Sequence, residues 1–302
     1  MKKCYVFPGQ GGQAVGMGKD LRDNNPAARA VFDEVDEFLG ERLSDLIFGG
    51  PAEELNLTKN VQPAIFAVSM AMYLGWKASP DAPGPVAPDF VAGHSLGEYS
   101  ALCAAGAAGI GGMARLLRKR GELMQSAVPA GRGAMAAIVG DVDVPAVCAE
   151  AEAATGGICG PANDNAPGQV VVSGNAAAVE KAVEIAKARG AKIAKTLAVS
   201  VPAHSGLMEP AADEFRAAMD GIEWKNPTCP FISNKTAGVM TDISEIRDAL
   251  VYQLTHGVRW RESVLGMPGF GIGEVVEIGP GSVLTGLVKR IVPELNSYKL
   301  EI

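Results

Sequence analysis

The chain has 302 residues, of which 48% are hydrophobic and 20% charged, so it can form one large domain or a core with an inserted subdomain. Its formal net charge of −7 disfavours contact with a phosphate backbone, and we expect no nucleic-acid binding. Its five cysteines are odd in number and include no CxxC pair, which indicates neither a disulfide framework nor a zinc site, and we expect no metal.

The N-terminus does not predict a secretion signal. After Lys2 and Lys3 the apolar run 4–7 ends at Pro8, whereas a signal peptide needs an apolar core of roughly 7–15 residues. No stretch approaches the ~20 apolar residues of a membrane span. We therefore expect a cytoplasmic protein with no membrane partner.

Strands and helices alternate in the first part of the chain. Asn25 followed by Pro26 is typical of a helix start, because asparagine caps the helix and proline suits its first position. Four prolines predict a loop at 79–88. The other predicted elements are a strand at 4–7, a helix carrying Val31, Phe32, Val35, Phe38 and Leu39, a buried helix at 63–76, a strand at 90–92, and helices at 96–108 and 112–128.

The pattern changes between residues 130 and 199. The predicted elements there are a strand at 134–140, a helix at 144–154, strands at 157–161 and 169–173 around the turn ANDNAPG, a helix capped by Asn175 and ending at Arg189, and a strand at 192–199. This βαββαβ order is the ferredoxin-like pattern. We therefore predict a small subdomain at 130–199, inserted into a core formed by 1–129 and 200–302.

The last part of the chain returns to the first pattern. Its predicted elements are a helix at 210–219, a strand at 229–233, a helix with Ile246, Leu250 and Leu254 on one face, a strand at 274–279 and a helix at 282–291. Strands that alternate with helices predict a parallel sheet covered on both faces. The fold class is therefore predicted to be α/β.

The stretch GHSLG at 93–97 fits the G-x-S-x-G pattern of a nucleophilic serine between a strand and a helix. The sharp turn needs glycine on both sides of Ser95, because a Cβ atom there would clash. The N–H of Leu96, at the start of the helix, is then aimed at the position of a developing oxyanion. The pattern predicts Ser95 as a nucleophile.

A serine hydroxyl needs a base, and the chain has three histidines. His94 adjoins Ser95, and neighbours on a turn point apart, so a packing role is favoured. His256 follows a helix and is predicted to be exposed. His204 follows a rigid, β-branched segment and is the best candidate. No Asp or Glu adjoins His204 in a way that identifies it as the orienting acid, so a backbone carbonyl could orient the imidazole.

The order of serine and histidine is wrong for an ordinary α/β-hydrolase, in which the histidine lies near the end of the chain. A serine esterase is therefore a weaker alternative. A non-catalytic binding module is weaker still, because it would not need Ser95 and His204 together.

Several stretches together resemble the bacterial malonyl-CoA:acyl-carrier-protein transacylases. They are FPGQGGQ (7–13), GPAEELN (50–56), GHSLGEYSAL (93–102), RGELMQ (120–125), GAMAAI (133–138), NDNAPGQVVVSG (163–174), VSVPAHSGLM (199–208) and EIGPGSVLTGL (277–287). The similarity runs from residue 4 to about 292. It implies an α/β-hydrolase-like core with a ferredoxin-like insertion.

The resemblance also implies roles for single residues. Ser95 matches the nucleophile and His204 the base. Gln10 matches the second oxyanion donor, beside Leu96, through its backbone N–H. Periodicity does not choose between Arg118 and Arg120 as the partner of a substrate carboxylate, but the family pattern matches Arg120. Gln253 matches the residue whose carbonyl orients the histidine.

The activity implied is transfer of malonyl from malonyl-CoA to the phosphopantetheine thiol of acyl carrier protein, through a malonyl-serine, to supply fatty acid synthesis. No cofactor is implied, and we expect a monomer. An acyltransferase of a polyketide synthase or of a malonate decarboxylase system is an alternative. Because carrier proteins of this kind are acidic, a basic patch is expected to dock them, with candidates Arg115, Arg118, Lys119, Lys187, Arg189, Lys192 and Lys195.

Overall fold

The computed structural model describes residues 1–79, 87–129, 131–199 and 201–302. Most of the loop predicted at 79–88, and the subdomain boundary residues 130 and 200, lie outside the described residues. Within the described residues, no helix is both long enough and apolar enough to cross a bilayer.

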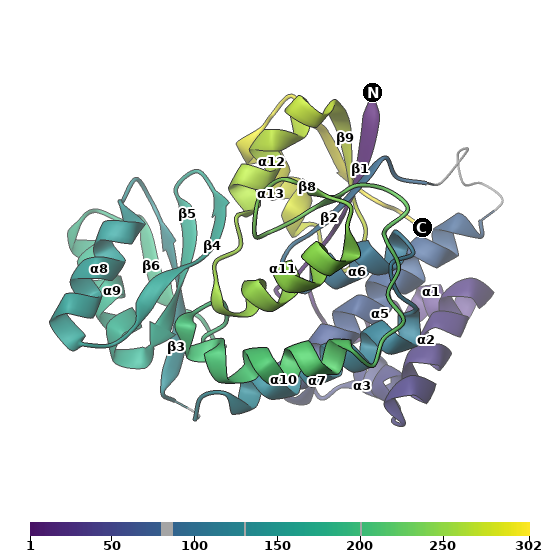
Figure 1. Cartoon of the computed structure of the whole chain (residues 1–302), viewed down its shortest axis with the longest axis horizontal. Coiled ribbons are helices and arrows are strands. Elements are labelled where there is room, and N and C mark those ends of the chain that lie inside the picture. The colour runs from purple at the N-terminus through teal and green to yellow at the C-terminus, as the bar shows by residue number, and fades with distance from the viewer. Residues whose placement is uncertain (80–86, 130, 200) are drawn as a thin grey trace.

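Two sheets organise the molecule (Figure 1). Within the described residues the larger has six strands in the order β10-β9-β1-β2-β7-β8, and all neighbours are parallel except β7 and β8. Its strands are β1 (Lys2–Phe7), β2 (Phe90–Gly93), β7 (Phe231–Ile232), β8 (Val239–Met240), β9 (Ile272–Glu277) and β10 (Asn296–Lys299).

Alternate side chains of this sheet enter two separate apolar cores, as the two-residue period of a strand requires. In β1, Tyr5 and Phe7 belong to the larger core, whereas Cys4 and Val6 belong to the smaller one. The larger core includes side chains of α2 (Pro26–Leu39), α5 (Thr58–Lys77), α6 (Gly97–Ala104), α7 (Ile110–Ser126), α10 (Glu209–Met219) and α11 (Ile243–Thr255), and the smaller those of α12 (Trp260–Gly266) and α13 (Val283–Ile291).

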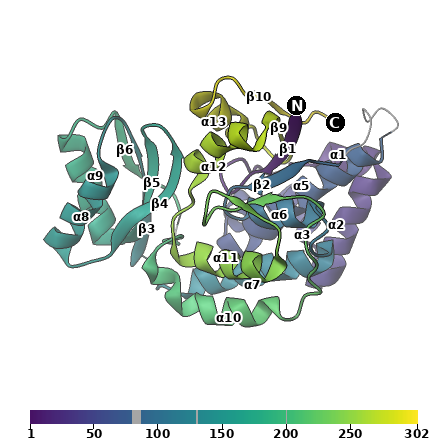
Figure 2. The same ribbon diagram turned by 45° about the horizontal axis from the view of Figure 1, so that its top comes forward.

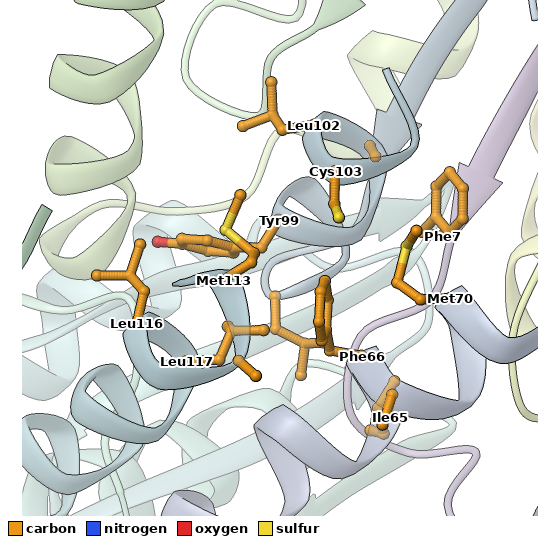
Figure 3. Packing of buried hydrophobic residues seen from close by; sticks show 14 of the residues in the cluster. Phe7, Ile65, Phe66, Met70, Tyr99, Leu102, Cys103, Met113, Leu116 and Leu117 are labelled. Atoms are coloured by element: carbon orange, nitrogen blue, oxygen red, sulfur yellow. The ribbon is translucent and has the colours of Figure 1, made fainter. Parts of the chain in front are cut away.

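Helices α5, α6 and α7 meet in the larger core. Figure 3 shows side chains of these helices gathered there, among them Phe66 of α5, Tyr99 of α6 and Leu117 of α7, with Phe7 of β1 beside Met70. All of these side chains are almost fully buried. Since α6 begins two residues after Ser95, this packing fixes the helix that carries the serine turn.

The smaller sheet has the strand order β4-β5-β3-β6 and is antiparallel. Helices α8 and α9 cover its outer face, away from the larger sheet (Figure 2). Its elements are β3 (Gly133–Val139), α8 (Val144–Thr155), β4 (Cys159–Ala166), β5 (Gln169–Asn175), α9 (Ala176–Ala188) and β6 (Ile193–Thr196). The predicted α/β class, with a parallel sheet and a small inserted βαββαβ sheet, is confirmed. The predicted division at 130–199 stays a prediction.

Several predicted boundaries were wrong for local reasons. The helix predicted at 63–76 begins at Thr58, so Pro63 lies inside it. The helix predicted at 96–108 ends at Ala104, before Gly106 turns the chain with a φ of 73°. Most of the turn predicted at 162–168 belongs to β4, which keeps pairing through two irregularities. Asn175 precedes α9, but its Oδ1 accepts from the N–H of Ile158 instead of capping the helix.

The remaining elements are short. They are α1 (Lys19–Asn24), α3 (Leu43–Gly49), α4 (Ala52–Leu55) and the 3₁₀ turns at Gly206–Met208 and Met267–Phe270. The predicted cap of α2 is confirmed, because the Asn25 side chain accepts from the N–H of Ala28.

Candidate active site

The turn between β2 and α6 holds Ser95 in a left-handed backbone conformation, with a φ of 52°. A non-glycine residue with this φ is uncommon and marks a backbone that its surroundings hold in place. A Cβ added to Gly93 would lie 1.9 Å from the carbonyl carbon of Gly97. A Cβ added to Gly97 would lie 2.0 Å from the carbonyl oxygen of Phe7. The two glycines are therefore required by the close approach of β1, β2 and α6.

Gly97→Ala is expected to destabilise the protein by about 3 kcal/mol, because the new methyl group overlaps backbone that cannot move without displacing β1. Urea unfolding measures the change. Gly286→Ala is the matched control, since Gly286 is exposed in α13 and an added Cβ would meet no atom within 4 Å. The control is expected to be neutral or stabilising by up to about 1 kcal/mol. Equal stability of the two variants would contradict the steric argument.

Three segments bring a serine, an imidazole and a carbonyl into line. Ser95 Oγ lies 2.8 Å from Nε2 of His204, and Nδ1 of His204 lies 2.7 Å from the backbone oxygen of Gln253. The carbonyl of Gln253 can only accept, so Nδ1 carries the proton and Nε2 is free to accept from the serine hydroxyl. His204 also has a positive φ, of 60°, and its backbone N–H donates to the carbonyl of Leu254.

His204 is held as a neutral imidazole. Burial and, to a smaller extent, the nearby charge of Arg120 lower its pKa to about 3, although the hydrogen bond to the Gln253 carbonyl acts in the opposite direction. A neutral imidazole is the form that can take a proton from serine.

Arg120 lies on α7 with its guanidinium almost fully buried, at 1% exposure. Its Nη1 donates to Gln62 Oε1 at 2.6 Å and its Nη2 to Gln253 Oε1 at 2.9 Å. Nη2 is also 3.5 Å from Ser95 Oγ, and the guanidinium lies over the Tyr99 ring. Within the described residues its Nε has no hydrogen-bond partner, and no carboxylate forms an ion pair with it. Burial lowers its pKa, as expected for a cation that lacks a direct counter-charge.

Arg118 points elsewhere although it lies only two residues away. Its guanidinium pairs with Glu41 and Asn60 near the surface. The structure therefore separates two arginines that periodicity could not.

A cavity of about 180 Å³ opens over Ser95 and His204. One wall comes from the small sheet, whose inner face contributes Met135 and Val171. The other wall comes from the core and includes Thr58, Met124 and Gln10, while Asn163 and Asn165 of β4 add polar groups. The site is thus a crevice between the two sheets, with an apolar lining and a few polar atoms.

The two expected oxyanion donors are placed differently. Leu96 directly follows the serine at the start of α6, and within the described residues its N–H has no acceptor. Gln10 lies after β1 and lines the same cavity. Gln10 thus borders the cavity over Ser95 and Leu96 adjoins the serine, and their roles as oxyanion donors stay predictions.

Within the described residues, neither of the other two histidines forms a hydrogen bond with the hydroxyl of Ser95. His94 Nε2 lies 2.7 Å from Asn165 Oδ1, and its ring packs near Trp260. His256 is exposed and stacks on Tyr252.

Several candidate docking residues are already paired with acidic side chains. They are Arg118 with Glu41, Lys119 with Glu214, and Arg189 with Glu150. Lys187, Lys192 and Lys195 are exposed on the small subdomain.

Comparisons with known proteins agree with this geometry. The model of the acyl transferase domain family matches residues 4–300. Malonyl CoA-acyl carrier protein transacylase of Bacillus subtilis is 49% identical over 96% of this chain and 90% of its own, and that of Escherichia coli K12 is 47% identical over 98% and 95%. The chain belongs to the malonyl-CoA:acyl-carrier-protein transacylase family.

Solved structures of the family superpose closely. The acyl-carrier-protein S-malonyltransferase of Bartonella henselae has a TM-score of 0.95 and 46% identity, and the match covers 100% of this chain and 96% of that one. A malonyl-transacylase in complex with its type II polyketide synthase acyl-carrier protein has a TM-score of 0.94 and 45% identity, over 99% and 96%.

In this member of the family, sequence reasoning missed a buried polar cluster below the serine turn. Glu98 and Asn234 are at most 1% exposed, and Gln62 is fully buried beside Arg120. Asn234 accepts from the N–H of Ser95 at 2.9 Å and donates to the carbonyl of Gly93 at 2.7 Å. The only signal in the sequence was a glutamate in the apolar run GEYSAL, a residue type that is almost never fully buried without a partner.

Within the described residues, no group of three or more histidine, cysteine, aspartate or glutamate side chains could hold a metal ion.

Proposed function

We propose that this chain transfers malonyl from malonyl-CoA to the phosphopantetheine thiol of acyl carrier protein through a malonyl-serine intermediate. One observation carries the proposal: a buried guanidinium that forms no ion pair with any carboxylate of the described residues lies 3.5 Å from a serine oxygen that is hydrogen-bonded to a neutral histidine. A buried cation in that position requires an anionic ligand, and guanidinium matches a carboxylate with two parallel hydrogen bonds. Malonyl is an acyl group that ends in a carboxylate.

In the first half of the reaction, His204 takes the hydroxyl proton as Ser95 attacks the thioester carbonyl. The negative charge that develops on the carbonyl oxygen is stabilised by the N–H groups of Leu96 and Gln10, each contributing on the order of 10²–10³ in rate. The C–S bond then breaks, and the CoA thiolate leaves with the proton from His204.

In the second half, the phosphopantetheine thiol gives its proton to His204 and attacks the malonyl ester. The C–O bond to Ser95 breaks, and the proton returns from His204 to the serine oxygen. Neither half changes an oxidation state, so the proposed chemistry requires no redox cofactor. Arg120 holds the malonyl carboxylate throughout.

The names of the relatives support this carrier. The curated relatives act on malonyl-CoA and acyl carrier protein by name, and one structural neighbour is bound to the acyl-carrier protein of a type II polyketide synthase. Fatty acid synthesis is the proposed destination, with a polyketide carrier as the second candidate. A monomer in the cytoplasm remains the expectation from the sequence.

Steady-state kinetics with malonyl-CoA and holo acyl carrier protein test the proposal. Parallel lines in double-reciprocal plots are expected, because free CoA leaves before the carrier binds. Hydrolysis of p-nitrophenyl acetate that greatly exceeds malonyl transfer would favour the serine esterase instead.

In a pH profile with malonyl-CoA, the decrease of kcat/KM on the acid side is expected well below pH 6.5, the ordinary pKa of histidine. The lowered pKa of His204 keeps the imidazole unprotonated, and active as a base, as the pH falls from 6.5 toward about 3. Over the same range, the contribution of His204 to stability is lost as the pH falls, because the unfolded chain then binds the proton more readily.

Arg120→Ala removes one cause of the low pKa of His204. The acid limb of the variant's pH–rate profile is therefore expected to move upward toward pH 6.5. The measurement is a pH profile of acyl-serine formation from acetyl-CoA, a substrate that makes no demand on the guanidinium. The electrostatic argument would be contradicted if the acid limb of the wild-type pH profile lay at pH 6.5 and that of the variant lay at the same pH.

A further inference from the structure

The Gln253 side chain joins the groups of the site through its amide. Its Oε1 accepts from Arg120 Nη2 at 2.9 Å. Its Nε2 donates to the backbone oxygen of Ser95 at 3.0 Å and to Oε2 of Glu98. The backbone oxygen of the same residue accepts from His204. One glutamine therefore contacts the nucleophile, the base and the arginine.

The shape of an amide does not decide which end faces the arginine, because the oxygen and the nitrogen are nearly equal in size. Hydrogen-bond partners decide it. Arg120 can only donate, so it requires the oxygen of Gln253. Burial raises the pKa of Glu98 to about 8, and above that pH its ionised carboxylate can only accept, so it requires the nitrogen. The two charged groups thus demand the same orientation from opposite ends of the amide.

Glu98 is itself held in place. It lies in the first turn of α6 with no exposed surface, and its Oε1 accepts from the N–H of Asn234 at 2.6 Å. Within the described residues no cation forms an ion pair with it. Its burial raises its pKa, while the hydrogen bonds from Asn234 and Gln253 and the charge of Arg120, on the far side of the Gln253 amide, act in the opposite direction without cancelling the effect of burial. A buried carboxylate is costly unless a cation and hydrogen bonds compensate it. Its presence here therefore calls for an explanation that the transfer mechanism does not supply.

We propose that Glu98 is a positioning residue that orients the Gln253 amide, so that the amide oxygen holds the Arg120 guanidinium at Ser95 for the carboxylate of the acyl group. Glu98 does not touch the substrate. It acts through Gln253, and it favours malonyl over acyl groups without a carboxylate. This inference rests on the proposed function and adds to it the residue that orients the arginine.

Glu98→Gln tests the inference with almost no change of shape. The new side chain has only one accepting oxygen, and Asn234 N–H and Gln253 Nε2 both need one. When the oxygen serves Asn234, two NH₂ groups face each other, and Gln253 relieves the conflict by turning its amide. Its Nε2 then faces Arg120, donor against donor, and the guanidinium loses one of its two amide acceptors, while Gln62 Oε1 remains.

The measurement is acyl-serine formation from malonyl-CoA and from acetyl-CoA at about pH 9, where Glu98 is ionised, each followed by rapid-quench mass spectrometry on the full chain. In Glu98→Gln, kcat/KM for malonyl-CoA is expected to fall about 10-fold more than that for acetyl-CoA, which corresponds to about 1.4 kcal/mol. The same variant in a Gln253→Met background should add no further loss of selectivity, because the amide through which Glu98 acts is gone.

Glu277→Gln is the matched control. Glu277 is equally buried, and its two oxygens accept from the N–H groups of Leu284 and Thr285 at the start of α13. This control is expected to lose stability and to keep the ratio of malonyl to acetyl transfer. It therefore separates a general cost of altering a buried carboxylate from an effect on Arg120.

Each outcome decides the question. Equal losses for both substrates in Glu98→Gln, or an unchanged ratio, would overturn the inference. Should that variant fail to fold, Glu98→Asp keeps the charge and shortens the reach, and an unchanged ratio there would overturn the inference as well. A wild-type protein that forms no malonyl-serine at all would instead overturn the proposed function.

Discussion

Ser95→Ala is expected to abolish the malonyl adduct that forms when the protein meets malonyl-CoA, and to lower transfer to the carrier by about 10⁴-fold or more. The reason is geometric: the hydroxyl lies 2.8 Å from the imidazole that activates it, on a turn that β1, β2 and α6 hold rigidly. Alanine removes the nucleophile and leaves the turn intact. Intact-protein mass spectrometry after brief exposure to malonyl-CoA measures the result directly.

Ser100→Ala is the matched control for this experiment. Ser100 lies on α6, the helix that follows the Ser95 turn, is fully buried, and within the described residues its hydroxyl has no hydrogen-bond partner. Its removal is expected to leave adduct formation unchanged, because no polar group loses a partner. His204→Ala should fold and yet form the adduct far more slowly. An adduct that persists in Ser95→Ala would move the nucleophile to another residue.

The local features of the fold could be read from the sequence because each depends on neighbouring residues. Asn25 and Pro26 start α2, the glycines at 93 and 97 define the serine turn, and alternation marks β3. The short segments α1, α3, α4, β8 and β10 were not predicted. Each has fewer than eight residues, which is too short for a periodic pattern to stand out.

The polar cluster could not be predicted because its contacts join distant parts of the chain. Ser95 meets Asn234 across 139 residues, and Glu98 meets Gln253 across 155. Neither pair follows from periodicity, and no single residue of the cluster belongs to a motif that the chemistry of serine transfer requires. The resemblance supplied Gln253 for its carbonyl, whereas the structure adds the contacts of its amide.

The choice between Arg118 and Arg120 shows the same limit. Two positions on one helix differ by about 200° in direction, since each residue turns by about 100°. Sequence alone does not say which direction faces the crevice, because α7 packs against both α5 and α10. The structure places Arg120 inward, between Gln62 and Gln253, and Arg118 outward against Glu41.

Arg120→Ala is therefore expected to lower kcat/KM for malonyl-CoA by on the order of 10²–10³, the effect of removing one partner of a buried, hydrogen-bonded charge pair. Acetyl transfer has no carboxylate to lose and should change less than about 10-fold. Arg120→Lys keeps the charge but not the two-pronged donor geometry, so an intermediate loss is expected. Acyl-serine formation from each CoA ester, measured in a single turnover, gives both numbers without the carrier.

Arg118→Ala controls for the loss of a cation from α7. It also removes an arginine side chain, two residues from Arg120, but the contact that it breaks is with Glu41 at the surface. It should leave the ratio of malonyl to acetyl transfer unchanged. If Arg120→Ala lowered both reactions equally, the guanidinium would serve the packing between Gln62, Tyr99 and Gln253 and not the substrate. A selective loss confined to malonyl would instead mean that the guanidinium holds the carboxylate of the substrate.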